Sequence, residues 1–322
     1  MMLRRCHLAD PRTATKIIDF VETTLCTFGR PTTMSLTKDQ VGDYRQNGYI
    51  VLDSFFDELT IQEVDQVIGQ ITHDAVTSGN TAGVMELEPQ SDGDVPRPRR
   101  ILEPFQQHEC FRRLVTSDKL LDSVASLLGP NLVLHISKLN FKPARVGSVV
   151  EWHQDLAYYP HTNDDLVTVL VYFDDATEEN GCLRVMPRQH DHYFDHHLQD
   201  GRFAGMITED IENGRFGSAV PLAAPSGSVI MMHPMTPHSS LPNRSDNSRR
   251  TLIVSFRASD AVPLFYNDRV VKAEKTACLV RGKPAKFARF GGPAPMLPQF
   301  EDSQDFKSLY TLQDEAKFQG TS

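Results

Sequence analysis

The sequence predicts a mainly β fold with flanking α-helices, of the barrel or jelly-roll type. Short apolar segments separated by turn residues recur after residue 131, as such a core requires. Before that position, three segments combine helical periodicity with helix caps. The 322 residues are 40% hydrophobic and 23% charged, enough for a sizeable core. We expect a poorly specified leader at 1–33, one domain at 34–265 (helical part 34–130, β core 131–260) and a C-terminal extension at 266–322.

The first predicted helix begins at a capping box formed by Thr37 and Gln40. It ends at Gly48, because glycine readily adopts the left-handed conformation that closes a helix. The four residues that follow, 49–52, are apolar and predict a strand. The β core therefore receives one strand from the helical part of the chain.

A second capping box, Thr60 with Glu63, predicts the start of the second helix. The third helix begins at Ser117 and is stopped by Gly129 and the proline after it. Between these helices, residues 76–100 contain three glycines and three prolines. That composition predicts a long mobile loop, of a length that is usually functional or disordered. The apolar face of the second helix is formed by Ile61, Val64, Ile68 and Ile71.

The β core is predicted from apolar segments of strand length. In residues 132–136 apolar side chains alternate with Val133 and His135, as in a half-buried strand. An Asn180-Gly181 turn separates two of the later strands. The expected strands are 132–141, 166–173, 182–186, 229–232 and 251–256.

Charge and composition exclude several classes of protein. A net charge of −9 argues against nucleic-acid binding, which normally uses a concentrated basic face. The longest largely apolar stretch, 166–173, is too short for a membrane span of roughly 20 residues. Five scattered cysteines without a CxxC pair predict reduced thiols. The N-terminus lacks the apolar run of a secretory signal, so we expect a cytoplasmic protein with neither nucleic-acid nor membrane partners.

The strongest local signal for chemistry is the run Trp152-His153-Gln154-Asp155. In a strand, residues i and i+2 point the same way, so His153 and Asp155 would present an imidazole and a carboxylate together. Two such ligands and a distant histidine would form the 2-His-1-carboxylate face associated with non-haem Fe(II) oxygenases. The triplet alone leaves open a solvent-facing strand pair. Trp152 would face the other way, into the core.

A second segment, at residues 238–249, supplies a candidate third metal ligand and an arginine that could bind a carboxylate. His238 lies just beyond the expected strand 229–232, where a partner strand would deliver a third ligand. Arg249 follows eleven residues later and offers a planar fork for a carboxylate. A surface salt bridge is the alternative role, and it suits Arg250, which would face outward.

These segments resemble one known family. The runs WHQDLAYYPHTNDDLVTVLVYFDDATEENGCLRVMPRQH and GSVIMMHPMTPHSSLPNRSDNSRRTLIVSFR are similar to the phytanoyl-CoA dioxygenase family of Fe(II)/2-oxoglutarate oxygenases. The resemblance covers roughly residues 35–260 and is strongest over 130–257. It implies a double-stranded β-helix, the cupin-like form of the jelly roll, with helices packed on one side.

The resemblance also implies roles for individual residues. Its cofactors would be Fe(II), 2-oxoglutarate as co-substrate and O2, with 2-oxoglutarate decarboxylated to succinate and CO2. The metal ligands would be His153, Asp155 and His238. Arg249 would bind the distal carboxylate of 2-oxoglutarate, with Ser240 and Arg100 as further co-substrate contacts. Tyr158, Tyr159 and His161 follow the HxD motif at the expected mouth of the barrel and are candidate substrate contacts, with ordinary packing as the alternative.

Other chemistry-bearing residues have simpler interpretations. The histidines at 190, 192, 196 and 197 could form a second metal site, but solvated loop positions suit them better. His233 and His135 are expected to be structural, and Met231, Met232 and Met235 to pack in strands. The basic segment 269–289 is read as a solvated tail, or as an electropositive rim for an anionic substrate.

The leading function is hydroxylation of an unactivated C–H bond in a small molecule that could be anionic. A non-catalytic metal- or oxo-acid-binding jelly roll is the first alternative, and the loss of a ligand or of Arg249 would have favoured it. A hydrolase or isomerase on a cupin-type barrel is the second, and it would act without oxygen or 2-oxoglutarate. All four positions are intact, which favours the oxygenase.

Overall fold

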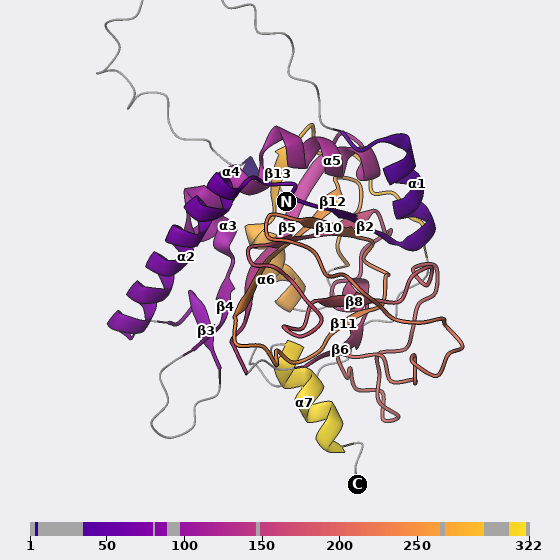
Figure 1. The fold of residues 1–322 in the computed structure, drawn as a ribbon. Coiled ribbons are helices and arrows are strands. Elements are labelled where there is room, and N and C mark those ends of the chain that lie inside the picture. The colour runs from indigo at the N-terminus through magenta and orange to yellow at the C-terminus, as the bar shows by residue number, and fades with distance from the viewer. Residues whose placement is uncertain are drawn as a thin grey trace, which may run out of the picture.

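The computed structural model describes residues 4–5, 35–79, 81–88, 97–145, 149–264, 268–292 and 309–319. Two β-sheets face each other, and helices cover the outer face of the larger one (Figure 1). This three-layer arrangement confirms the predicted jelly roll with flanking helices. Except for residues 4–5, the expected leader lies outside the described residues.

The larger sheet has the order β1-β13-β5-β12-β7-β10-β2, and a β3–β4 hairpin joins it at β5. The smaller sheet has the order β6-β11-β8-β9. The strands of the larger sheet are β1 (Arg4–Arg5), β2 (Tyr49–Leu52), β3 (Met85–Leu87), β4 (Pro98–Leu102), β5 (Leu132–Lys142), β7 (Leu166–Tyr172), β10 (Val229–Met232), β12 (Arg249–Ala258) and β13 (Cys278–Arg281). Those of the smaller sheet are β6 (Val150–His153), β8 (Leu183–Val185), β9 (Val220–Pro221) and β11 (His238–Ser240).

The helices confirm the three that the sequence predicts and add others. The helix α5 packs against β7 and β12, and α4 packs against α2 and α5. The short α3 and α4 follow β4 and were not expected from the sequence. The helices are α1 (Lys38–Asn47), α2 (Glu58–Ser78), α3 (Pro104–Gln107), α4 (Glu109–Val115), α5 (Asp118–Leu128), α6 (Asp268–Thr276) and α7 (Leu309–Gln319).

Strand β7 shows how the two layers of core are divided. Alternate residues Val167, Val169 and Val171 join the core beneath the helices. Leu170 and Tyr172 point the other way, into a second core between the two sheets. Because both faces are covered, β7 is apolar almost throughout, with Thr168 as the polar exception. That exception lies in the site described below.

The start of the second helix differs from the prediction. Its N-cap is Asp57, three residues before Thr60, and α2 begins at Glu58. The Asp57 carboxylate accepts hydrogen bonds from the Thr60 backbone amide (2.9 Å) and the Thr60 hydroxyl (2.6 Å). Asp is as good a cap as Thr, and here its position one turn earlier decides the boundary. The predicted apolar face holds, with Ile61, Val64 and Ile68 buried.

The expected loop at 76–100 is partly ordered. The helix α2 continues to Ser78, and β3 and β4 pair as an antiparallel hairpin. The hairpin forms because β4 also pairs with β5, which continues the sheet. Residues 89–96, where a mobile tip was expected, lie outside the described residues.

The prediction that the basic segment 269–289 is a solvated tail is wrong for its first part, although residues 282–289 are exposed. The segment contains most of α6 and all of β13, which pairs with β5 and buries Cys278 and Leu279. Its arginines form ion pairs with acids of the main domain: Arg281 with Asp122 and Arg289 with Asp260 and Asp165. The side chains of Arg269 and Lys272 lie outside the described part. The segment anchors the C-terminal extension to the larger sheet.

One buried ion pair ties α6 to the barrel and predicts a stability effect. Arg257 donates to Glu274 at 2.6 Å, and the two side chains are only 3% and 5% exposed. Removing one partner of a buried pair leaves an uncompensated charge, so Glu274→Ala should lower the free energy of unfolding by about 3–5 kcal/mol. Arg289→Ala, which breaks half-exposed pairs, should cost less than about 1 kcal/mol. Urea unfolding measures both, and equal midpoints for the two variants would contradict the assignment.

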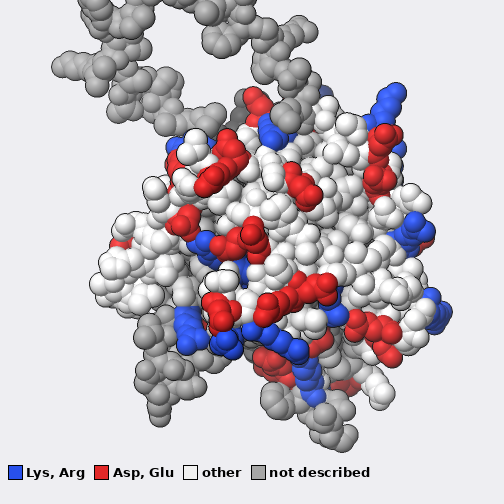
Figure 2. Space-filling view, in the orientation of Figure 1, with Lys and Arg blue, Asp and Glu red and all other residues white. Residues whose placement is uncertain are grey.

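Acidic and basic side chains lie beside each other over most of the face shown in Figure 2, and basic side chains gather along its lower part. Within the described ranges, no helix is both long and apolar enough to cross a membrane.

Candidate metal centre and adjoining pocket

Two histidines meet between neighbouring strands of the smaller sheet. His153 ends β6, His238 begins β11, and the two residues are paired in register. Their ring centroids are 4.0 Å apart. The sequence predicted that a partner strand would deliver the second histidine, and β11 does so.

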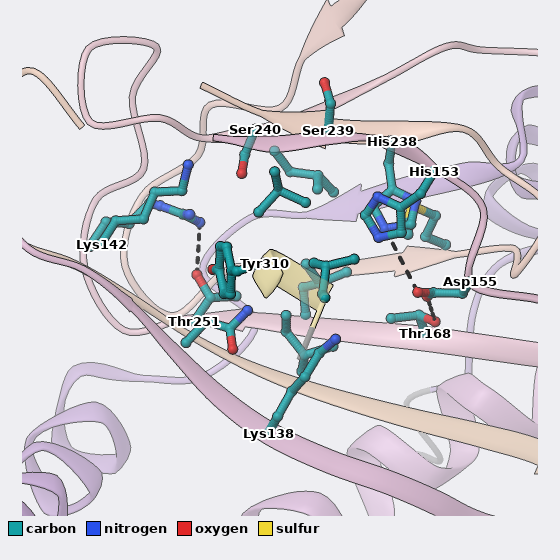
Figure 3. Close-up of a pocket in the computed structure, with 18 residues that line it drawn as sticks. Lys138, Lys142, His153, Asp155, Thr168, His238, Ser239, Ser240, Thr251 and Tyr310 are labelled. Carbon is teal, nitrogen blue, oxygen red and sulfur yellow. Dashed lines mark hydrogen bonds and ion pairs between the residues drawn. The ribbon is translucent and has the colours of Figure 1, made fainter. Parts of the chain in front are cut away.

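The Asp155 carboxylate lies beside the two histidines as predicted, but Asp155 is not part of the strand that carries His153. The strand β6 stops at His153, and Asp155 begins a short 3-10 helix, η2 (Asp155–Ala157). Gln154 between them is extended (φ −116°, ψ 133°), so both neighbours still project to one side. His238 Nε2 lies 3.8 Å from Asp155 Oδ1, as Figure 3 shows. Ligand atoms of all three side chains lie within 4.8 Å of one another.

Hydrogen bonds orient each of the three side chains. The Nδ1 atom of His153 lies 2.8 Å from the Glu151 carbonyl, and that of His238 lies 3.0 Å from the Thr236 carbonyl. A ring that donates from Nδ1 presents the lone pair of Nε2 to a metal. The Thr168 hydroxyl, from β7, donates to Asp155 Oδ2 at 2.5 Å and fixes the carboxylate. No local pattern in the sequence predicts this contact.

The charge states of the three side chains suit a metal. Burial lowers the pKa of both His153 and His238, so both imidazoles are neutral at ordinary pH. Burial acts to raise the pKa of Asp155, but the positive charge of Lys138 and the Thr168 hydrogen bond act against it, and the pKa is lowered overall. Two neutral imidazoles and one carboxylate are the donor set of non-haem Fe(II) sites, so the residues fit that ion.

The remaining histidines have other roles. His196 Nε2 accepts a hydrogen bond from the Gln154 backbone amide (3.0 Å) and so supports the segment between two ligands. His190 contacts the Arg45 carbonyl, His197 pairs with Asp195, and the His233 ring accepts from a backbone amide. In the described part of the chain, His153, Asp155 and His238 form the one cluster able to hold a metal, so the alternative of a second metal site is not seen there. His196 and His197 are buried, so the expected solvated loop position is wrong for these two.

A pocket opens beside the triad, between the two sheets (Figure 3). It is lined by three cationic side chains, Lys138 and Lys142 from β5 and Arg249 from β12. Apolar walls come from the strands of both sheets, and Tyr310 of α7 projects into the space. The sequence did not single out either lysine or α7. The apolar walls are Val150, Leu170, Leu183, Met232, Ile253 and Leu309.

The two neighbouring arginines point to opposite sides of β12, as predicted. Arg249 is buried in the pocket, where it donates to the Thr251 hydroxyl at 2.9 Å. Arg250 instead pairs with Asp174 (2.6 Å) and with Asp65. Arg249 is thus the arginine available to a ligand.

Of the two other expected co-substrate contacts, one lines this pocket and the other does not. Ser240 lines it, and Figure 3 shows its side chain directed inward. Arg100, on β4, pairs with Glu86 at 2.6 Å and is not among the lining residues. Ser240 therefore lies in the same pocket as Arg249, whereas Arg100 lies on the β3–β4 hairpin and does not line the pocket.

None of the three candidate substrate contacts is among the residues that line the described pocket, and one of them, Tyr158, packs against the triad. The Tyr158 hydroxyl bonds the Gly205 carbonyl, and its ring meets His153 edge to face at 5.7 Å. His161 is buried with Nδ1 2.6 Å from the Tyr159 carbonyl. The rings of Tyr159 and His161 lie 5.1 and 5.0 Å from that of buried His135. Their contact with a substrate remains a prediction.

The phytanoyl-CoA dioxygenase (PhyH) family model matches residues 44–251. A "probable alpha-ketoglutarate-dependent hypophosphite dioxygenase" of Stutzerimonas stutzeri is 33% identical over 235 residues, 70% of this chain and 80% of that protein. A methylphosphonate hydroxylase of Gimesia maris is 28% identical over 224 residues, 70% of this chain and 82% of that protein. The structure of EctD from S. alaskensis with 2-oxoglutarate and 5-hydroxyectoine has a TM-score of 0.61 at 21% identity, covering 92% of this chain and 98% of that one.

The matched segment contains the histidine–carboxylate cluster and Arg249, so sequence, fold and site agree. The protein is an iron- and 2-oxoglutarate-dependent dioxygenase, and its chain belongs to the phytanoyl-CoA dioxygenase family.

Proposed function

We propose that this dioxygenase oxidises a small substrate carrying an oxyanion, with Fe(II) held by His153, Asp155 and His238. The observation that carries the proposal is the position of Lys138, a cation in the same pocket as the triad and Arg249. Its charge is close enough to lower the pKa of Asp155 and of both histidines.

The protein's own contribution to the reaction is to bind, orient and exclude water. Bound Fe(II) supplies dioxygen activation, coupled to decarboxylation of 2-oxoglutarate to succinate and CO2. His153 and His238 present Nε2 to the ion, and Thr168 holds the Asp155 carboxylate in place. The apolar wall of the pocket keeps water from the reacting groups and strengthens the electrostatic contacts inside it.

The co-substrate is bound between the metal and the opposite end of the pocket. Arg249 faces the distal carboxylate of 2-oxoglutarate with its planar fork, which matches a carboxylate. The Thr251 hydroxyl holds the guanidinium, and Ser240 adds a hydroxyl donor on the facing strand. Arg249 thereby sets the direction in which the 2-oxo acid meets the metal.

A count of charges supports the anionic substrate. The two carboxylates of 2-oxoglutarate are matched by the metal and by Arg249, and Lys138 adds a further basic side chain to the pocket lining beside the triad. The relatives from S. stutzeri and G. maris carry names that specify hypophosphite and methylphosphonate, both phosphorus oxyanions. Hypophosphite and methylphosphonate are therefore the first substrates to test.

The proposed function is tested by loading the protein with Fe(II) and 2-oxoglutarate without oxygen, then adding air and one candidate substrate. Succinate release above the substrate-free rate is the readout. We expect it with a small oxyanion and not with uncharged molecules of similar size. Turnover of an uncharged molecule, with none for any oxyanion, would contradict the proposed substrate class.

Lys138→Met should raise KM for the oxyanion by roughly 10- to 100-fold, because a charge-assisted hydrogen bond contributes about 1.5–3 kcal/mol. The affinity for 2-oxoglutarate should change much less, since Arg249 binds it at the other end of the pocket. Lys138→Arg, which keeps the charge, should recover part of the loss. KM values from succinate release decide the matter, and an unchanged KM in Lys138→Met would exclude Lys138 as the recognition cation.

A further inference from the structure

Two buried basic side chains lie side by side at the end of the pocket away from the triad. Lys142 ends β5, Arg249 begins β12, and the two residues are paired in register. Both side chains line the pocket, and the residues are only 2% and 6% exposed. We propose that Lys142 is a second cation for the distal carboxylate of 2-oxoglutarate and that the co-substrate binds together with one proton. The inference rests on the proposed placement of 2-oxoglutarate in this pocket.

The surroundings of Lys142 disfavour a charged amine in the free protein. Within the described residues, no carboxylate lies within ion-pair distance of it. The groups that face it are Arg249 from β12, Arg184 from β8, Cys182 just before β8, and Glu88 just after β3, whose influence is the smallest. Burial first, and then the charge of Arg249, lower the pKa of Lys142 to about 6. A lysine can lose its proton in this way, whereas an arginine cannot.

The amine is nevertheless held in a defined place. Lys142 Nζ donates to the Leu241 carbonyl. That carbonyl lies against Gly181 (φ +75°), where any Cβ would collide with its oxygen. The close approach of the Leu241 carbonyl to residue 181 therefore requires glycine there. The carbonyl in turn holds the Lys142 amine near Arg249 without supplying a counter-charge.

Arg249 also has unused capacity for a carboxylate. Its Nη1 donates to Thr251, but its buried Nε has no hydrogen-bond partner among the described residues. A buried guanidinium nitrogen without an acceptor is costly, and a carboxylate would satisfy it. The distal carboxylate of 2-oxoglutarate can thus accept from Arg249 and from Lys142 together. Its negative charge raises the pKa of Lys142, and the amine takes one proton from solvent.

The uptake of a proton by Lys142 fixes the direction in which 2-oxoglutarate affinity changes with pH. Above pH 6 the free amine is mostly neutral, while in the complex it is charged up to about its ordinary pKa of 10.4. Between these values binding takes up close to one proton, so the dissociation constant should rise about tenfold per pH unit. The proton returns to solvent when the co-substrate leaves.

The test is calorimetric titration of 2-oxoglutarate into the Fe(II)-loaded protein without oxygen at pH 7.5. Repeating it in buffers of different ionisation enthalpy gives the number of protons taken up. We expect about one for the wild type and about zero for Lys142→Met, with roughly tenfold or greater loss of affinity near pH 7. Lys138→Met, the matched lysine at the other end of the pocket, should keep the uptake.

Lys142→Arg provides a second variant, since it restores a permanent charge and should bind without proton uptake. Unfolding midpoints measured alongside verify that the variants fold. Binding by the wild type without proton uptake would overturn the inference, as would unchanged uptake in Lys142→Met. A wild type that binds no 2-oxoglutarate would overturn the proposed function itself, so the two failures are distinguishable.

Discussion

His238→Ala is expected to lose Fe(II) and, with it, all turnover of 2-oxoglutarate, while the fold survives. His238 is one of the three members of the candidate metal cluster, and the other two, His153 and Asp155, lie close together on one short segment of the chain. Iron affinity should fall by roughly a thousandfold or more, equivalent to about 4 kcal/mol. Metal content after anaerobic reconstitution and dialysis measures the loss, and succinate release measures turnover.

His190→Ala is the matched histidine control. Its ring contacts the Arg45 carbonyl and belongs to no metal-binding cluster in the described part of the chain, so its removal should leave iron content unchanged. Retention of iron at wild-type affinity by His238→Ala would show that the metal lies elsewhere. Loss of iron in both variants would indicate a general loss of structure rather than of a ligand.

The metal cluster was predictable from the sequence in its members but not in its local geometry. Alternation along a strand placed His153 and Asp155 on one side, yet the strand ends at His153. What keeps Asp155 in position is Gln154, whose amide donates to the carbonyls of His192 and Met235, both at 2.6 Å. Those acceptors are distant in the chain, and a local pattern cannot reveal them.

The two pocket lysines were missed because of a β-bulge. Regular alternation from Leu132 onward assigns Lys138 and Lys142 to the same face as the apolar Leu134. In the structure one extra residue, His135, interrupts the pairing of β5 with β12. The phase of the strand shifts there, so the lysines turn into the pocket. A single sequence carries no clear signal for such a shift.

Some of the helices are determined by local sequence signals, and others depend on contacts with distant parts of the chain. The first predicted helix is confirmed because its capping box is complete: the Thr37 side chain and the Gln40 side chain each satisfy a backbone amide. The unexpected α4 is capped by His108, whose ring accepts from the Cys110 amide. Histidine is not a typical capping residue, and this helix depends on burying Phe111 and Leu114.

Arg249→Ala is expected to weaken 2-oxoglutarate binding by roughly 30- to several-thousand-fold while iron binding changes little. The guanidinium is buried, and losing one partner of a desolvated charge pair costs about 2–5 kcal/mol. Arg249→Lys should recover only part of the affinity, because one ammonium group cannot form two parallel hydrogen bonds. Titration of 2-oxoglutarate into the Fe(II) form without oxygen measures all of these values.

Arg250→Ala is the control for this prediction, because its side chain points outward and pairs with Asp174 and Asp65. Its removal should leave the affinity for 2-oxoglutarate unchanged even if stability falls somewhat. The charge of Arg249 helps to lower the pKa of Lys142, so residual binding by Arg249→Ala should depend on pH less steeply than binding by Arg249→Lys, which keeps a charge at that position. Wild-type affinity in Arg249→Ala would mean that the distal carboxylate is held elsewhere, and the assignment of this pocket to 2-oxoglutarate would fail.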